Sequence, residues 1–285
     1  PSGTPPVGMT AAAGLAGSRL VLADRAGAGA NVHEHWGRER IEARAALGAE
    51  SVPWLMQELT RVNLENFMMD SCRESYGEGL IGVITVLAGR DAQARRELNL
   101  RLQSRVTTPD QRAWLLLGLS GLRVIPPDLF DGLVAGLTCP LAMNRMRASE
   151  LLGRMGDPRA VEPLREALRR ETNGHTKIRI ALHLAWLGED EGIDSLALHA
   201  RSDPRWDVRG VACGLLRHVR APAHKVKALA VLRERIRRED NQLAGAQVTG
   251  SLQVLEGKTW KEVMQTYLPW QVEEKPPTVT TAPAY

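Results

Sequence analysis

The chain has 285 residues, a formal net charge of +4 and only 4% aromatic residues, while 44% of its residues are hydrophobic. It contains no apolar run of the ~18 to 20 residues that a bilayer-spanning helix needs, and no long polar–apolar alternation of the kind that builds β-sheets. The composition therefore favours a soluble, all-α protein over a membrane-spanning or all-β one.

Residues 1–36 differ from the middle of the chain. The stretch from Met9 to Ala23 is rich in Ala, Gly and Leu, which fits a small-residue helix or the remnant of an export signal. His33-Glu34-His35 supplies two metal ligands, but such a pair needs at least one further protein ligand to hold a metal. We therefore expect a helix or linker without a metal site.

Apolar residues at helical spacing begin soon afterwards. Val52, Leu55 and Leu59 fit the second helix of an early helix pair. The segment from Gly79 to Leu102 fits another pair, although Gly82 and the β-branched run after it disfavour a helix.

Three consecutive segments in the middle of the chain then repeat one pattern. A shift of 35 positions superimposes Arg112, Ala113, Leu116, Leu117, Gly118 and Gly121 on Arg147, Ala148, Leu151, Leu152, Gly153 and Gly156. A further shift of 32 positions places Arg147 on Arg179 and Gly156 on Gly188. Periods between about 30 and 40 residues mark stacked helical repeats, and a fourth, less regular unit starts near Val208.

Each unit has the pattern of two short amphipathic helices. Ala148, Leu151, Leu152 and Met155 recur at steps of three and four, as do Val161, Leu164, Ala167 and Leu168. Gly153 and Gly156 are predicted to end the first helix, since glycine accepts the left-handed conformation of a helix C-terminus. Asp157 and Pro158 are predicted to start the second helix.

The segment from Arg147 to Leu168, R-x-x-x-L-L-G-x-x-G-D-P-R-A-V-x-P-L-x-x-A-L, resembles a HEAT-like repeat of the type described in phycobilisome lyase subunits. The resemblance implies an α-solenoid of about six to seven helix pairs over residues 37–270, with first helices on the convex side and second helices lining the concave side. The stretch from Gln247 to Trp270 would close the stack, and residues 271–285, rich in Pro and Thr, are predicted to be a disordered tail.

Basic side chains are concentrated in the best repeats, because residues 141–240 hold 20 basic and 14 acidic side chains. Seven of the basic residues fall on predicted second helices: Arg165, Arg169, Arg170, Arg201, Lys225, Lys227 and Arg233. If these helices line the groove, its positive potential would attract acidic protein segments, phosphate or nucleic acid. Glu162 and Glu166 lie close by in sequence, so the alternative interpretation is a solvated, self-neutralised helix face.

Other candidate sites have weaker patterns. Cys72, Cys139 and Cys213 lie far apart without C-x-x-C spacing, which predicts buried thiols and favours a cytoplasmic location, with export as the alternative. Trp186, Trp206 and Asp207 are the residue types of a HEAT-like DNA glycosylase site, but the apolar neighbours of Trp186 favour core packing.

No phosphate-binding loop, nucleophile elbow or H-E-x-x-H motif occurs in the chain. We therefore expect a non-catalytic protein–protein interaction or scaffold module, without a cofactor, that binds an acidic or extended protein partner in its concave groove. The alternative is a nucleic-acid-binding HEAT-like protein such as a DNA glycosylase, and a more distant one is a phycobilin lyase-like subunit.

Overall fold

The computed structural model describes residues 38–61 and 74–268, which contain α-helices, short 3-10 helices and turns but no β-strand. The chain divides into two compact units, one up to Gly136 and the other from Leu137 onward. The all-α prediction is confirmed for this part of the chain. Cys72, His33-Glu34-His35 and the segments 1–36 and 271–285 lie outside the described residues.

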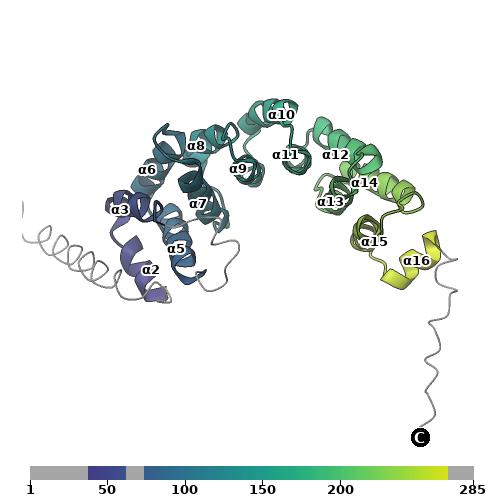
Figure 1. Ribbon diagram of the computed structural model, residues 1–285, viewed down its shortest axis with the longest axis horizontal. Coiled ribbons are helices and arrows are strands. Elements are labelled where there is room, and N and C mark those ends of the chain that lie inside the picture. The colour runs from purple at the N-terminus through teal and green to yellow at the C-terminus, as the bar shows by residue number, and fades with distance from the viewer. Residues whose placement is uncertain (1–37, 62–73, 269–285) are drawn as a thin grey trace, which may run out of the picture. The chain divides into compact units, whose positions relative to one another are not determined.

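Unit 1 consists of two rows of helices (Figure 1). Its helices are α2 (Arg38–Ala45), α3 (Ser51–Glu58), α5 (Glu74–Arg90), α6 (Ala92–Gln103), α7 (Pro109–Ser120) and α8 (Phe130–Gly136). Helices α2, α5 and α7 pack one on the next, and α6 packs on α8. The β-branched Val83 and Ile84 lie in α5 and are fully buried, so burial in the core outweighs their weak helix propensity.

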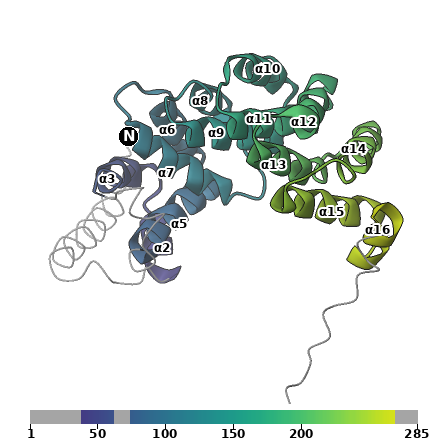
Figure 2. The same ribbon diagram turned by 45° about the vertical axis from the view of Figure 1, so that its right-hand side comes forward.

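Unit 2 continues the plan of paired helices. Its helices are α9 (Ala142–Met155), α10 (Val161–Arg170), α11 (Gly174–Trp186), α12 (Asp190–Ser202), α13 (Trp206–Leu216), α14 (Pro222–Arg235), α15 (Gln242–Glu256) and α16 (Trp260–Tyr267). The first helices α9, α11, α13 and α15 form a curved inner row, and the second helices α10, α12 and α14 form the outer row (Figures 1 and 2). Among the described residues, no helix is both long and apolar enough to cross a bilayer.

The expectation that second helices line the concave side is wrong for unit 2, because the first helices lie on the inside of the curve. Several contacts between first helices are made at glycine residues. A Cβ on Gly153 of α9 would lie 2.8 Å from the Cβ of His183 in α11, and one on Gly210 of α13 would lie 3.1 Å from the Cα of Ala244 in α15. Glycine therefore lets neighbouring first helices approach closely. Close approach between first helices fits their place on the inside of the curve of unit 2.

The predicted turn between the paired helices is largely confirmed. Gly156 ends α9 with a φ of 72°, and the Asp157 side chain accepts a hydrogen bond from the backbone N–H of Arg159. Pro158 follows at the first position of a 3-10 helix (Pro158–Ala160) that leads into α10. Gly153, by contrast, lies inside α9, so its predicted role as a helix end is wrong and its role is close packing.

An arginine–glutamate pair joins the two ends of one repeat and recurs in another. Arg145 of α9 donates to both carboxylate oxygens of Glu171, which follows α10, at 2.7 and 2.9 Å, and also to the carbonyl oxygens of Cys139 and Pro140. Arg209 of α13 bonds Glu239 and the carbonyl oxygens of Asp203 and Pro204 in the same manner. We call these two arrangements the Arg–Glu clasps.

The last helices of the described chain complete unit 2. Glu256, at the end of α15, accepts hydrogen bonds from Tyr267 of α16 at 2.6 Å and from Arg233 of α14 at 2.8 Å. The predicted closing segment therefore forms α15 and α16 up to Tyr267, while Trp270 lies outside the described residues.

Candidate functional site

The seven basic residues predicted to bind a partner lie on the outer row of unit 2. Helix α10 carries Arg165, Arg169 and Arg170, α12 carries Arg201, and α14 carries Lys225, Lys227 and Arg233. The structure places them on the predicted second helices but not on the inside of the curve (Figure 1).

Six of these seven side chains form ion pairs with carboxylates. Arg165 contacts Glu189 at 2.9 Å and Glu191 at 2.7 Å, which links α10 to the next repeat. Two pairs join α12 and α14, Arg201 with Glu234 and Lys227 with Asp194. The others are Arg169 and Arg170 with Glu166, and Arg233 with Glu256. These pairs neutralise much of the positive charge of the outer row.

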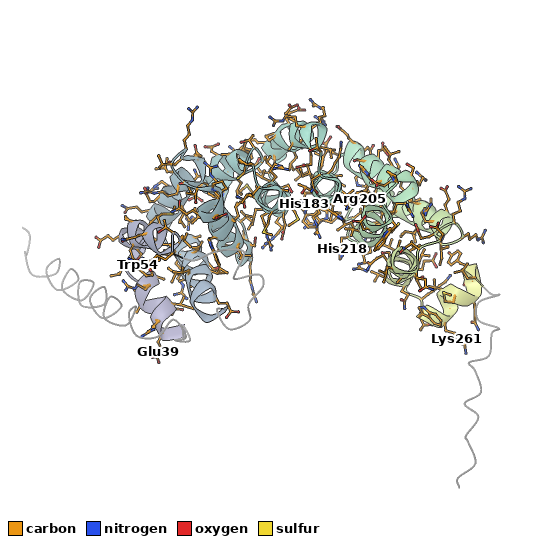
Figure 3. The ribbon with its side chains drawn as sticks, viewed as in Figure 1. Glu39, Trp54, His183, Arg205, His218 and Lys261 are labelled. Atoms are coloured by element: carbon orange, nitrogen blue, oxygen red, sulfur yellow. The ribbon has the colours of Figure 1, made fainter. Side chains whose placement is uncertain are left out.

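A different group of basic and aromatic side chains lies on the row of first helices. Its members come from the end of α9, from α11 and from the turn after α13, and we call it the inner patch: Arg154, Arg179, Trp186, Arg217, His218 and Arg220. Figure 3 labels His218, which lies on the inner side of this row. All members belong to unit 2.

Trp186 is the centre of the inner patch. Its indole N–H donates to the carbonyl oxygen of His218 at 2.9 Å, and the guanidinium carbon of Arg220 lies 4.0 Å from its ring centroid. The centroid of the His183 ring lies 4.9 Å from that of Trp186. A guanidinium over an indole face is held by the negative potential of the ring, so Trp186 and Arg220 orient each other.

Altered pKa values show that the positive charges of the inner patch lie close together. Burial, followed by the charge of Arg154, lowers the pKa of Arg220 below its usual range. Burial, followed by the charges of Arg179 and Arg220, lowers the pKa of His183 to about 3. Burial and the charge of Arg217 likewise lower the pKa of His218. Both imidazoles are therefore neutral near pH 7.

The inner patch is poorly compensated by carboxylates. Within the described ranges, Arg179, Arg217 and Arg220 form no ion pair, and Arg217 instead donates to His218 Nε2 at 3.2 Å. Arg154 lies 3.8 Å from the carboxylate of Glu150, which it shares with Arg147. The inner row thus presents a net positive surface to an approaching anion.

The residues that suggested a DNA glycosylase do not assemble into one site. Asp207 bonds Arg205 and, at 3.0 Å, His175, so it lies at the N-terminal ends of α11 and α13. The bond from Trp186 to His218 places that tryptophan at the C-terminal ends of the same two helices. An 11-residue helix such as α13 is about 16 Å long, so Trp186 and Asp207 lie at opposite ends of the row.

The thiols and the potential metal ligands of the described residues are the remaining candidates for a chemical site. Cys139 and Cys213 are buried, and burial raises the pKa of Cys213 to about 12, which makes its thiol unreactive at neutral pH. No group of three or more potential metal ligands occurs in residues 38–61 and 74–268.

Paired helices that pack mainly on their sequence neighbours define a helical repeat protein, and such arrays commonly act as binding surfaces. Residues 130–217 match the family model for HEAT repeats, and the helices on either side continue the same all-α plan, which supports a HEAT-like repeat architecture. HEAT repeats are generally protein-interaction scaffolds. No curated protein and no solved structure matches the chain. The matched model is the one for HEAT repeats, so the phycobilisome lyase type stays a resemblance.

Sequence reasoning found the repeat but missed the inner patch. The charge pattern of the helices could have revealed the patch, because α11 contains two Lys or Arg residues and no acidic residue, whereas α10 and α12 contain both basic and acidic residues. The recurrence of arginine at Arg147 and Arg179 also pointed to the first helices.

Proposed function

We propose that the protein is an interaction module that binds an acidic segment of another protein on the inner row of unit 2. The observation that carries the proposal is the uncompensated charge of Arg179, Arg217 and Arg220 around Trp186. A carboxylate-rich segment would supply the countercharge that this surface lacks. An aromatic residue and arginines at the centre of a patch also match the residue types that dominate binding energy at interfaces.

The seven outer-row residues are a second candidate surface for the same partner. Their carboxylate partners would have to be displaced or shared when an acidic segment binds, which weakens the net attraction. Binding there stays a prediction, and the outer row serves as the matched control for the inner patch.

The proposal is tested by charge reversal with a fluorescent Glu-rich peptide as the probe. Replacing Arg217 and Arg220 with Glu should weaken binding at least about tenfold, because two close charge pairs become repulsive. Replacing Arg169 and Arg170 with Glu makes the same change in net charge on the outer row and should have less than about a twofold effect. Fluorescence anisotropy at constant ionic strength measures both.

Equal losses in the two variants would assign the binding to net charge alone, and a larger loss in the outer variant would favour the seven predicted residues.

Nucleic acid is the competing ligand, since arginines beside a tryptophan also bind phosphates and bases. A salt titration with random duplex DNA separates the two, because binding through Z phosphates falls with log salt at a slope near −0.9Z. Submicromolar, steeply salt-dependent DNA binding without peptide binding would overturn the proposal.

A further inference from the structure

One side of α15 is uncharged and exposed. No residue from 242 to 255 of this helix is charged. The side chains of Leu243 and Val254 are large, apolar and 66% and 63% exposed. Gly250 and the exposed Ala246 lie between them, and the spacing of these four residues places them along one side of the helix. We call Leu243, Ala246, Gly250 and Val254 the α15 stripe.

Arg217 of the inner patch lies directly beside the α15 stripe. A Cβ on Gly250 would lie 3.7 Å from Nη1 of Arg217, which is an ordinary van der Waals distance. Val254 follows Gly250 by one helical turn on the same side of α15. The basic inner patch therefore continues into an apolar surface, and Arg217 marks the border between the two.

The acidic residue of α15 does not offset the charge of Arg217. Glu256 is the single acidic residue of this helix, and its side chain is only 5% exposed. Its carboxylate already pairs with Arg233 and Lys258 and accepts a hydrogen bond from Tyr267. A molecule that covers the α15 stripe therefore meets apolar side chains with a positive charge at their edge.

The size and charge of this surface favour a short acidic segment over a second copy of the chain. Stable protein–protein complexes bury roughly 800 Å² on each partner, far more than one Leu, one Val, one Ala and one Gly provide. A second copy would also bring its own arginines close to Arg217, and like charges repel. An acidic segment gains from the apolar stripe and from charge pairing together.

We propose that the α15 stripe binds large apolar side chains of the same acidic segment that the inner patch binds. This proposal rests on the proposed function and specifies its ligand as a segment in which carboxylates and apolar residues are neighbours. The carboxylates pair with Arg217 and the rest of the inner patch, while the apolar side chains cover Leu243 and Val254. Apolar burial supplies affinity that salt does not screen.

The experiment compares three fluorescent peptides of equal length with the full chain. They repeat Glu-Ser-Ser, Glu-Leu-Ser and Gln-Leu-Ser, so the first two share their charge and the last two share their leucines. Anisotropy titrations should show Glu-Leu-Ser binding about fivefold to tenfold more tightly than Glu-Ser-Ser, because its leucines bury apolar surface on the stripe. This ratio should persist at high salt, and Gln-Leu-Ser should bind at least about tenfold more weakly than Glu-Leu-Ser.

Variants of the protein locate the apolar contact. Val254→Gln should weaken the binding of Glu-Leu-Ser about threefold to fivefold and change that of Glu-Ser-Ser by less than about twofold. Val226→Gln is the matched control, because Val226 is a 70% exposed valine on α14 of the outer row. Arg217→Gln should weaken the binding of both acidic peptides. Circular dichroism melts establish that each variant is folded.

The outcomes separate this proposal from the one on which it depends. Equal binding of Glu-Ser-Ser and Glu-Leu-Ser, lost when Arg217 and Arg220 are replaced with Glu, would overturn the role of the α15 stripe while the proposed function stands. Equal effects of Val254→Gln and Val226→Gln would also overturn that role. If neither acidic peptide binds, both proposals fail. A dimer in sedimentation experiments that Val254→Gln dissociates would assign the stripe to a second copy of the chain.

Discussion

At the scale of single residues, His183 shows how burial controls a titratable group in this fold. The Ser149 hydroxyl donates to the carbonyl oxygen of Met146 at 2.7 Å and lies 2.9 Å from His183 Nδ1. A hydroxyl has one proton, so His183 Nδ1 must be the protonated nitrogen and donate to the Ser149 oxygen. The ring is held as a neutral imidazole between α9 and α11.

This histidine should make stability depend on pH. Its pKa falls from 6.5 in an unfolded chain to about 3 in the folded protein, so between these values the unfolded state binds the extra proton. The free energy of unfolding therefore has its full value above about pH 6.5 and decreases as the pH falls, by about 2 kcal/mol at pH 5. Urea unfolding between pH 7 and 5 measures the slope. His183→Gln should flatten it, and an unchanged slope would contradict this assignment.

Glycine contacts offer a second prediction at this scale. Gly153→Ala should destabilise the protein by about 1 to 3 kcal/mol, because the new methyl group overlaps the side chain of His183. Gly245→Ala in α15 is the control, since nothing lies within 4 Å of the added carbon. It should be neutral or stabilise the helix by about 0.5 to 1 kcal/mol. In thermal melts, the melting temperature should therefore fall for Gly153→Ala and should stay the same or rise for Gly245→Ala.

At the scale of helices and turns, the two Arg–Glu clasps hold the ends of α10 and α14 against the turns that precede α9 and α13. The Glu171 carboxylate is almost fully buried, and besides Arg145 it accepts the backbone N–H groups of Thr172 and Asn173. Burial raises the pKa of Glu171, but the hydrogen bond from Arg145 and the backbone bonds outweigh that effect and leave the pKa below its usual range.

Breaking one clasp should be costly. Arg145→Met leaves the buried Glu171 without its guanidinium and should lower the free energy of unfolding by about 3 to 5 kcal/mol. Arg159→Met in the same repeat removes an exposed pair and should cost less than about 1 kcal/mol. Chemical denaturation compares the two. Similar losses would mean that the clasp contributes no more than a surface ion pair.

The helices themselves were accessible to sequence reasoning, whereas the clasps were not. Periodic apolar residues and the Gly156-Asp157-Pro158 punctuation predict the first and second helices, since both signals are local. The clasp partners Arg145 and Glu171 are separated by a whole helix pair, and the carbonyl oxygens that complete the clasp have no residue type to reveal them. The misassignment of Gly153 has a related cause, because a helix end and a helix contact both favour glycine.

At the scale of the whole molecule, charge separates into a neutralised outer row and a poorly compensated inner row within unit 2. The sequence predicts the excess of basic residues and its location in the best repeats. It does not predict which helices line the inside of the curve, since this depends on glycine contacts between residues about 30 positions apart. The seven predicted residues therefore lie on the outer row instead of the inside of the curve, and binding there stays a prediction, while the expectation of a basic inner surface is the basis of the proposed function.

A repeat architecture also limits how far a core defect spreads. Leu152→Ala should cost about 2 to 5 kcal/mol, because Leu152 is fully buried. Helix α9 packs on α11 and not on α14 to α16, so hydrogen exchange should accelerate in α9 to α11 while α15 keeps most of its protection. The exposed Leu198 gives the control variant Leu198→Ala. Uniform acceleration across unit 2 would show that it opens as a single cooperative block.

The recurrence of the clasp has a consequence for how such an array can change length. Arg145 and Arg209, and likewise Pro140 and Pro204, are 64 positions apart, whereas the intervening first helix has Lys177 near the corresponding position. The modular unit is therefore two helix pairs, one clasped and one unclasped. Duplication or excision in steps of this unit would keep clasped and unclasped pairs alternating along the array. A single-pair insertion or deletion would place two pairs of the same kind side by side.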